Sequence, residues 1–257
     1  MNPAASVFPA PAALRLFGIP VADIRPGELH QFLAEAIRRR RKALVLNVNV
    51  HCVTLALRNP RYKKFLCDAP LVFCDGDGVR WGLRLLGHRP PPKITYASWL
   101  WDLAAFCERR HYSLYFLGAR PGVADLAARR LQGVFPGLRI AGIYHGYFDR
   151  EGPENERVIQ DIRRVKPDIL IVGLGMPIQE EWLSRHWQRM EANIFLTGGA
   201  VFDYASGTLR RAPGWMRTLH LEWLFRFLQE PRRLFKRYVF GNLYFFYRVL
   251  AERILGK

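Results

Sequence analysis

The sequence is short of acidic residues and has no long apolar run. Its 22 Asp and Glu face 39 Lys and Arg, which gives a formal net charge of +17. Such a charge attracts polyanions, including nucleic acid, anionic lipid and phosphorylated substrates, without choosing among them. No apolar stretch approaches the ~20 residues that span a bilayer, and residues 1–13 lack the basic and apolar regions of a signal peptide. We therefore expect a flexible arm over 1–13 and a protein that stays in the cytoplasm.

Common cofactor and metal motifs are also missing. No Gly-x-Gly-x-x-Gly follows the first predicted strand and there is no Walker loop, which excludes standard dinucleotide and P-loop folds. The four cysteines form no Cys-x-x-Cys pair and have no histidine at zinc-finger spacing. They lie in apolar stretches, so we expect buried free thiols: Cys52, Cys67, Cys74 and Cys107. The sequence predicts no cofactor and, apart from one alternative below, no metal.

Short apolar, β-branched runs alternate with stretches of helical periodicity. Predicted strands cover 43–50, 70–75, 113–118, 138–146, 168–175 and 193–199, and the clearest helices cover 27–42, 99–110 and 123–135. Continuous apolar strands between helices indicate an α/β fold with a parallel sheet covered by helices on both faces. We assign this domain to residues 14–203. Ligands of such sheets bind beyond the carboxyl ends of the strands.

Residues 204–257 differ in composition from the rest of the chain. They carry eleven Lys or Arg against three Glu, a net charge of +8, and contain no candidate strand. We predict two helices, 214–229 and 231–254, separated by Pro231. Basic residues beside dense aromatics favour a helix lying on an anionic membrane surface. The alternative is that its apolar face packs on the domain.

Polar side chains at two predicted strand ends are candidates for chemistry. Asn47 and Asn49 share one face of a strand, and Asp75 ends the next strand. Side by side they would share one crevice, where Asp75 could take a proton from an attacking hydroxyl. Alternatively, Asp75 caps the following helix. With Asp77 it also matches the Asp-x-Asp pattern of metal-dependent glycosyltransferases.

Two later strand ends could hold a nucleotide base. Gly146 and Tyr147 follow one predicted strand, and Asp203 follows another, so we expect them at neighbouring strand ends. The tyrosine ring could stack on a base, and the aspartate could accept a hydrogen bond from an imide N–H.

Taken together, these segments resemble the bacterial WecG/TagA/CpsF glycosyltransferase family. The blocks follow the family's order from about residue 15 to the end of the sequence. They are Asn47-Val48-Asn49, Cys74-Asp75-Gly76-Asp77-Gly78, His145-Gly146-Tyr147-Phe148, Gly173-Leu174-Gly175-Met176-Pro177-Ile178-Gln179-Glu180, Thr197-Gly198-Gly199-Ala200-Val201-Phe202-Asp203, Arg211-Ala212-Pro213, Leu221-Glu222-Trp223-Leu224-Phe225-Arg226 and Glu230-Pro231-Arg232-Arg233.

The resemblance implies a Rossmann-like catalytic domain and an inverting transfer from a UDP-sugar to an undecaprenyl-diphosphate-linked sugar. The transferred sugar would be N-acetylmannosamine-like, or glucose or a uronic acid, for a cell-surface polysaccharide or teichoic acid. The enzyme would sit peripherally on the inner face of the cell membrane. A homo-oligomer is an open alternative to a monomer.

The resemblance also implies roles for single residues. Asp75 matches the catalytic base, and Asn49 belongs to the same acceptor-side pocket. Asn47 stands where the family commonly has threonine. Gln179 matches a polar pocket residue.

Further matches concern the donor. Tyr147, with Gly146, and Asp203 match positions that hold the uridine. Arg226 and Arg233 fall in the basic C-terminal appendage, which in the family folds over the site and meets the membrane. Asp77 is outside the family pattern, and residues 93–96 depart from the usual Arg and Gly-Asp version of that loop.

Two competing interpretations remain. One is a metal-dependent transferase that uses Asp75 and Asp77 together, which chelation would inactivate. The other is a non-catalytic basic module that binds nucleic acid or acidic polymer, with steeply salt-dependent binding and no turnover. The preferred interpretation involves no nucleic acid.

Overall fold

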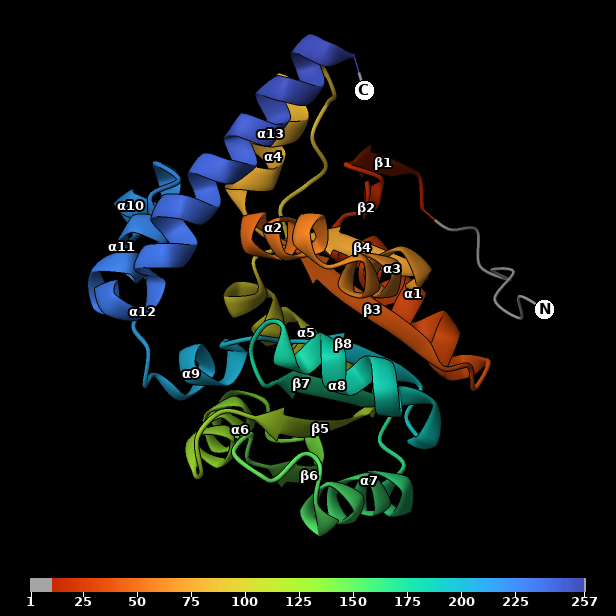
Figure 1. Cartoon of the computed structure of the whole chain (residues 1–257). Helices are drawn as coiled ribbons and strands as arrows, with labels where there is room; N and C mark the ends of the chain where they lie inside the picture. The colour runs from red at the N-terminus through yellow and green to blue at the C-terminus, as the bar shows by residue number, and fades with distance from the viewer. Residues whose placement is uncertain (1–10, 257) are drawn as a thin grey trace, which may run out of the picture.

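The computed structural model describes residues 11–256 (Figure 1). Most of the predicted arm, residues 1–10, lies outside this range, but Ala13 already begins the first strand, so an arm reaching residue 13 is too long. Eight strands form one sheet in the order β1-β2-β4-β3-β8-β7-β5-β6. Only the β1–β2 pair is antiparallel. The strands are β1 (Ala13–Leu16), β2 (Ile19–Ala22), β3 (Ala43–Val48), β4 (Leu71–Cys74), β5 (Ser113–Gly118), β6 (Arg139–Tyr144), β7 (Ile169–Gly173) and β8 (Ile194–Thr197).

The six predicted strands are confirmed, and the hairpin β1–β2 was missed. Its strands have four residues each, joined by Phe17 and Gly18, both with positive φ. Strands this short carry too little alternation to stand out from a loop.

Helices cover both faces of the sheet, as predicted. They are α1 (Pro26–Arg38), α2 (Val50–Arg58), α3 (Pro60–Asp68), α4 (Asp77–Leu85), α5 (Tyr96–Arg110), α6 (Val123–Val134), α7 (Pro153–Val165), α8 (Ile178–His186) with the 3-10 turn η1 (Trp187–Arg189), and α9 (Val201–Ser206). Alternate strand residues point to opposite faces. Thus Val45 joins the core beneath α1, α5, α6 and α9, whereas Leu44 and Leu46 join the core beneath α2, α3, α7 and α8.

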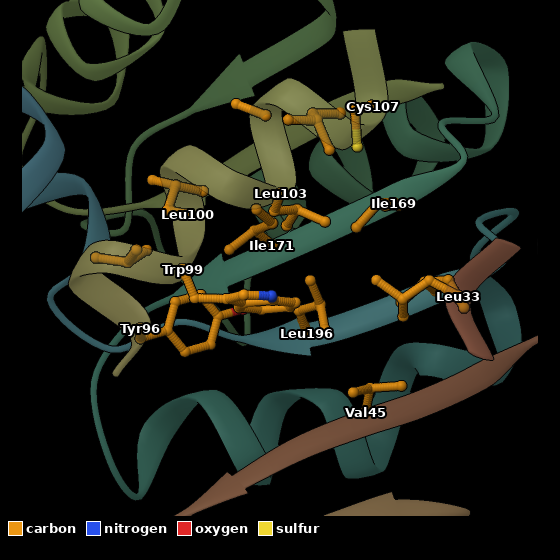
Figure 2. Close-up of a cluster of buried hydrophobic side chains, with 14 of the residues drawn as sticks. Leu33, Val45, Tyr96, Trp99, Leu100, Leu103, Cys107, Ile169, Ile171 and Leu196 are labelled. Atoms are coloured by element: carbon orange, nitrogen blue, oxygen red, sulfur yellow. The ribbon is translucent and has the colours of Figure 1, made fainter. Parts of the chain in front are cut away.

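The first of these cores is centred on α5. Figure 2 shows Leu103 of α5 beside Ile171, and Trp99 of the same helix beside Leu196 of the sheet. Cysteines 52, 74 and 107 are buried free thiols as expected, but Cys67 is exposed, contrary to the prediction. It is the penultimate residue of α3.

The C-terminal segment contains more helices than predicted. They are α10 (Gly214–Thr218), α11 (Glu222–Gln229), α12 (Pro231–Phe235), the π-helical turn η2 (Lys236–Phe240) and α13 (Gly241–Leu255). The first expected helix is broken at His220, which has positive φ. Pro231 starts α12, where its missing N–H is tolerated. No strand occurs between residues 204 and 256, as predicted.

Helix α13 packs on α2 and α4 (Figure 1). Its Phe245 and Val249 are fully buried and belong to the core on the α2 side of the sheet. A Cβ atom on Gly82 of α4 would lie 2.7 Å from the Phe245 ring, so this contact requires glycine. The last helix is therefore part of the hydrophobic core, in agreement with the alternative that its apolar face packs on the domain.

Strands β3 and β8 are neighbours, yet the chain leaves them toward opposite faces. After β3 it enters α2, and after β8 it enters α9, which belongs to the other core. In parallel α/β sheets, such a divergence opens a crevice at the carboxyl ends of the two strands. The candidate site lies there.

Candidate functional site

A cavity of about 1270 Å³ occupies this crevice. Its floor comes from the ends of β3, β4 and β8, and includes Asn47, Asn49, Asp75 and the Gly198–Gly199 turn. Its other walls come from α2, from the start of α4, from residues 93–97 and from the helices of the C-terminal segment. The structure therefore brings together the two asparagines and Asp75, as predicted.

Asp75 is held at the floor of the cavity by two donors. Asn47 Nδ2 donates to its Oδ2 atom at 3.0 Å, and the backbone N–H of Tyr96 donates to its carboxylate. Burial raises the pKa of Asp75 to about 6, although these two hydrogen bonds act in the opposite direction. The alternative role as a helix cap is wrong, because the N-cap of α4 is Gly76. A carboxyl group that titrates near neutral pH can accept a proton during a reaction.

The two asparagines have different tasks. Asn47 is buried, and its Oδ1 accepts a hydrogen bond from Thr197 Oγ1 at 2.9 Å, so its amide N–H group points at Asp75. Asn49 caps α2, because its Oδ1 accepts from the Cys52 N–H at 3.1 Å. Asn47 therefore orients the carboxylate, and Asn49 shapes the adjoining wall.

The Asp77 carboxylate is in contact with three basic side chains. Its Oδ2 accepts from Lys93 Nζ at 2.7 Å, and its Oδ1 lies 3.0 Å from His220 Nδ1 and 3.3 Å from Arg80. Burial acts to raise the pKa of Asp77, but the contacts with Lys93 and His220 outweigh it and lower the pKa. Among residues 11–256, no cluster of three His, Cys, Asp or Glu could hold a metal ion.

Arg226 and Arg233 line the cavity, as the resemblance implied. The Arg226 guanidinium is buried, pairs with Glu230 and lies 5.6 Å from the centre of the Tyr204 ring. Its NH1 atom is buried without a hydrogen-bond partner in the described chain. Arg233 also pairs with Glu230, at 2.7 Å. A buried guanidinium with a free donor is suited to an anionic ligand.

Asp203 lies beside these arginines but in helix α9, not at a strand end. Burial raises its pKa, and the charges of Arg226 and Arg233 act against that rise. Its neighbour Tyr204 lines the cavity, whereas Asp203 is not among the described residues that do so.

Gly146 and Tyr147 lie at the end of β6, on the far edge of the sheet. Strands β7 and β5 separate β6 from β8, so the prediction that Tyr147 and Asp203 stand at neighbouring strand ends is wrong. Tyr147 is 69% exposed and is not among the described residues that line the cavity. A Cβ atom on Gly146 would lie 3.1 Å from Gly118 Cα, so the ends of β5 and β6 approach closely.

Gln179 is fully buried behind the Gly198–Gly199 turn. Its Oε1 accepts from the Gly199 N–H at 2.9 Å, and its Nε2 donates to Glu180 Oε1 at 2.7 Å. Burial raises the pKa of Glu180 to about 7. Gln179 thus fixes the turn that forms part of the cavity floor.

Sequence reasoning missed several cavity residues. Arg237 and His51 line the cavity, as do Lys93, Tyr96 and His220. The C-terminal segment contains many basic residues, and nothing in their spacing marks Arg237. Lys93 and His220 are recognisable only through their contacts with Asp77.

The cavity combines a buried carboxylate, four arginines (Arg58, Arg226, Arg233 and Arg237) and a largely apolar wall. Apolar side chains come from α2 and from residues 234–246: Val50, Leu55, Leu234, Val239, Phe240, Leu243 and Phe246. The arrangement can deprotonate a hydroxyl, bind phosphate and accommodate an apolar chain.

Known proteins are similar to this chain over most of its length. The family model described as "Glycosyl transferase WecG/TagA/CpsF family" matches residues 14–257. The N-acetylglucosaminyldiphosphoundecaprenol N-acetyl-beta-D-mannosaminyltransferase of Staphylococcus aureus strain MW2 is 28% identical over 190 residues, which are 74% of this chain and 73% of that protein. The protein of the same name from Bacillus spizizenii is 28% identical over 215 residues, which are 82% of each chain.

Proposed function

The chain belongs to the WecG/TagA/CpsF family of glycosyltransferases, and from this we propose that it transfers a sugar from a UDP-sugar to a polyprenyl-diphosphate-linked sugar. The names of its relatives support an N-acetylmannosaminyl group as the first candidate for transfer and an undecaprenyl diphosphate as the lipid carrier. The product would enter a cell-surface polysaccharide or a teichoic acid.

The observation that carries this proposal is the position of Asp75 at the floor of a cavity with both basic and apolar walls. In our proposal, Asp75 takes the proton of the acceptor hydroxyl as its oxygen attacks the anomeric carbon. The bond between that carbon and the diphosphate breaks, UDP leaves, and the anomeric configuration inverts. The free carboxylate predominates above pH 6, because the pKa of Asp75 is about 6.

Arg226 and Arg233 are proposed to hold the donor diphosphate and to stabilise the charge that develops as it departs. The buried, unpartnered NH1 atom of Arg226 supports this role. We place the uridine toward Asp203 and Tyr147. A base stacked on Tyr147 would have to extend across the ends of β7 and β5, where Gly118 and Gly173 pack closely, since a Cβ atom on Gly118 would lie 2.3 Å from Gly173 O.

A membrane-facing role is proposed for the C-terminal segment. Large apolar side chains are exposed on it: Trp215, Trp223, Leu219, Leu228, Phe235, Phe240, Leu243, Tyr247, Leu250, Ile254 and Leu255. Exposed apolar groups beside a net charge of +8 favour docking on an anionic bilayer at its cytoplasmic face. Within residues 11–256, no helix has both the length and the apolar character to cross a bilayer.

A donor screen tests the proposal. The purified chain is incubated with a panel of UDP-sugars and a short-chain prenyl-diphosphate N-acetylglucosamine, and transfer is read by mass spectrometry. We expect one UDP-sugar to be consumed with an inverted product, in EDTA as well as in Mg²⁺. Activity that disappears in EDTA would favour the Asp-x-Asp alternative. Absence of transfer from every donor would refute the proposal.

A further inference from the structure

The cavity is also lined by Arg237, a half-buried arginine that the roles assigned so far leave unused. Arg237 lies in the π-helical turn η2, a rare conformation that is often found at functional sites. Its Nε atom is buried and has no hydrogen-bond partner among residues 11–256. A buried cationic donor without a partner is unfavourable in the empty protein and is satisfied by an anion.

Arg237 and Arg226 serve different sides of the crevice. The charge of Arg226 influences Asp203 and Tyr204, both on α9. The charge of Arg237 influences Asp75 and also His51 and Cys52, both on α2. Both arginines line the same cavity, and since α2 and α9 leave adjacent strands toward opposite faces, the two guanidiniums lie toward different sides of it.

The surroundings of Arg237 are suited to a ligand that is both anionic and lipidic. Val239 and Phe240 follow it in η2, and Leu243 and Phe246 of α13 line the same cavity. Helix α13 packs on α2, which contributes Leu55 to the lining. Burial, with a smaller effect of the Arg237 charge, lowers the pKa of His51 to about 4, so at neutral pH its uncharged ring can donate one hydrogen bond.

We propose that Arg237, assisted by His51, binds the diphosphate of the lipid-linked acceptor, while Arg226 and Arg233 bind the diphosphate of the donor. The prenyl chain then runs along the apolar strip between α2 and α13, and the acceptor sugar reaches Asp75. This inference rests on the proposed function, because only a transferase with two diphosphate substrates needs two such positions.

Binding measurements test the assignment independently of turnover. Calorimetry compares UDP with farnesyl-diphosphate N-acetylglucosamine as ligands of the full chain and of three variants: Arg237→Met, Arg226→Met and the control Arg232→Met. Arg232 is exposed on α12 and is not among the described residues that line the cavity. We expect Arg237→Met to weaken acceptor binding about 10- to 100-fold and to leave UDP affinity unchanged. Arg226→Met should do the reverse, and the control should do neither.

A second ligand isolates the diphosphate. Farnesyl N-acetylglucosaminide has the same chain and sugar without the phosphates, so the full chain and Arg237→Met should bind it equally. The assignment would be overturned if Arg237→Met lost the same affinity for the ligand with the diphosphate and the ligand without it. A loss of UDP affinity in Arg237→Met would overturn it as well. Arg237→Lys keeps the positive charge but loses the planar arrangement of N–H donors, so it should recover part of the acceptor affinity. If Arg237→Met is unstable, Arg237→Lys replaces it in these measurements.

Membrane headgroups are the other source of a lipidic phosphate. Vesicles of phosphatidylglycerol should bind Arg237→Met and Arg232→Met alike, and a loss confined to Arg237→Met would assign Arg237 to the headgroups instead. If neither acceptor binds the full chain and the donor screen shows no transfer, the proposed function itself fails. If transfer occurs but Arg237→Met keeps normal acceptor affinity, only the present inference fails.

Discussion

Replacing Asp75 with asparagine should make the protein less active and, at alkaline pH, more stable. The stability argument follows from the buried carboxyl group. Its pKa rises from 3.8 in the unfolded chain to about 6 in the folded protein, about two units, which corresponds to about 3 kcal/mol. The folded state therefore loses stability as the pH rises from 3.8 to 6, and the whole penalty persists above pH 6.

Asparagine removes this penalty but also disturbs the hydrogen bonds. Asp75 accepts from Asn47 Nδ2 and from the Tyr96 N–H, and an amide can accept through its single oxygen only. The loss of one hydrogen bond costs about 1–2 kcal/mol. At pH 8 the variant should gain about 1–2 kcal/mol, a rise of a few degrees in Tm for a chain of this size. Below pH 4 it should be less stable than the parent.

Thermal unfolding monitored by circular dichroism from pH 3.5 to 8 measures both the expected gain in stability at pH 8 and the expected loss below pH 4. A stability difference that does not change with pH would show that Asp75 does not titrate in this range and would refute the reasoning. In the same variant, turnover should fall by roughly 10²–10⁴ with UDP affinity retained. Near-normal turnover would exclude Asp75 as the base.

Other features give further tests. Glu180→Gln should retain activity and, at pH values above 7, should have a higher Tm than the parent, because it removes a buried carboxyl group whose pKa is about 7. An unchanged Tm at these pH values would show that ionisation of Glu180 does not destabilise the folded protein. Gly82→Ala should destabilise the protein by about 1–3 kcal/mol, since its Cβ would lie 2.7 Å from the Phe245 ring, whereas Gly133→Ala has open space and should be neutral or stabilising. Tyr147→Ala and Asp203→Ala should each weaken UDP binding in calorimetry, and unchanged affinity in both would remove the uridine from this edge of the sheet.

Much of the fold could be read from local patterns. The continuous apolar runs predicted all six strands from β3 to β8. Five of them are buried at every position, and a strand buried on both faces must be apolar throughout; only β6, at the edge of the sheet, is partly exposed. Asn47, Asn49 and Asp75 could be placed in one crevice for a related reason: the carboxyl ends of parallel strands meet at one edge of the sheet. The short hairpin β1–β2 and the break at His220 lack such a pattern and were missed.

The sequence by itself determined the parallel sheet, the polar strand ends and the basic, aromatic C-terminal segment, because these depend on periodicity and composition within a few residues. Tertiary structure alone decided that β6 and β8 are three positions apart, that Asp77 pairs with Lys93 and His220, and that α13 belongs to the core. It also decided which arginines of the C-terminal segment reach the cavity. These features depend on the path of the chain between distant residues, and no local pattern encodes that path.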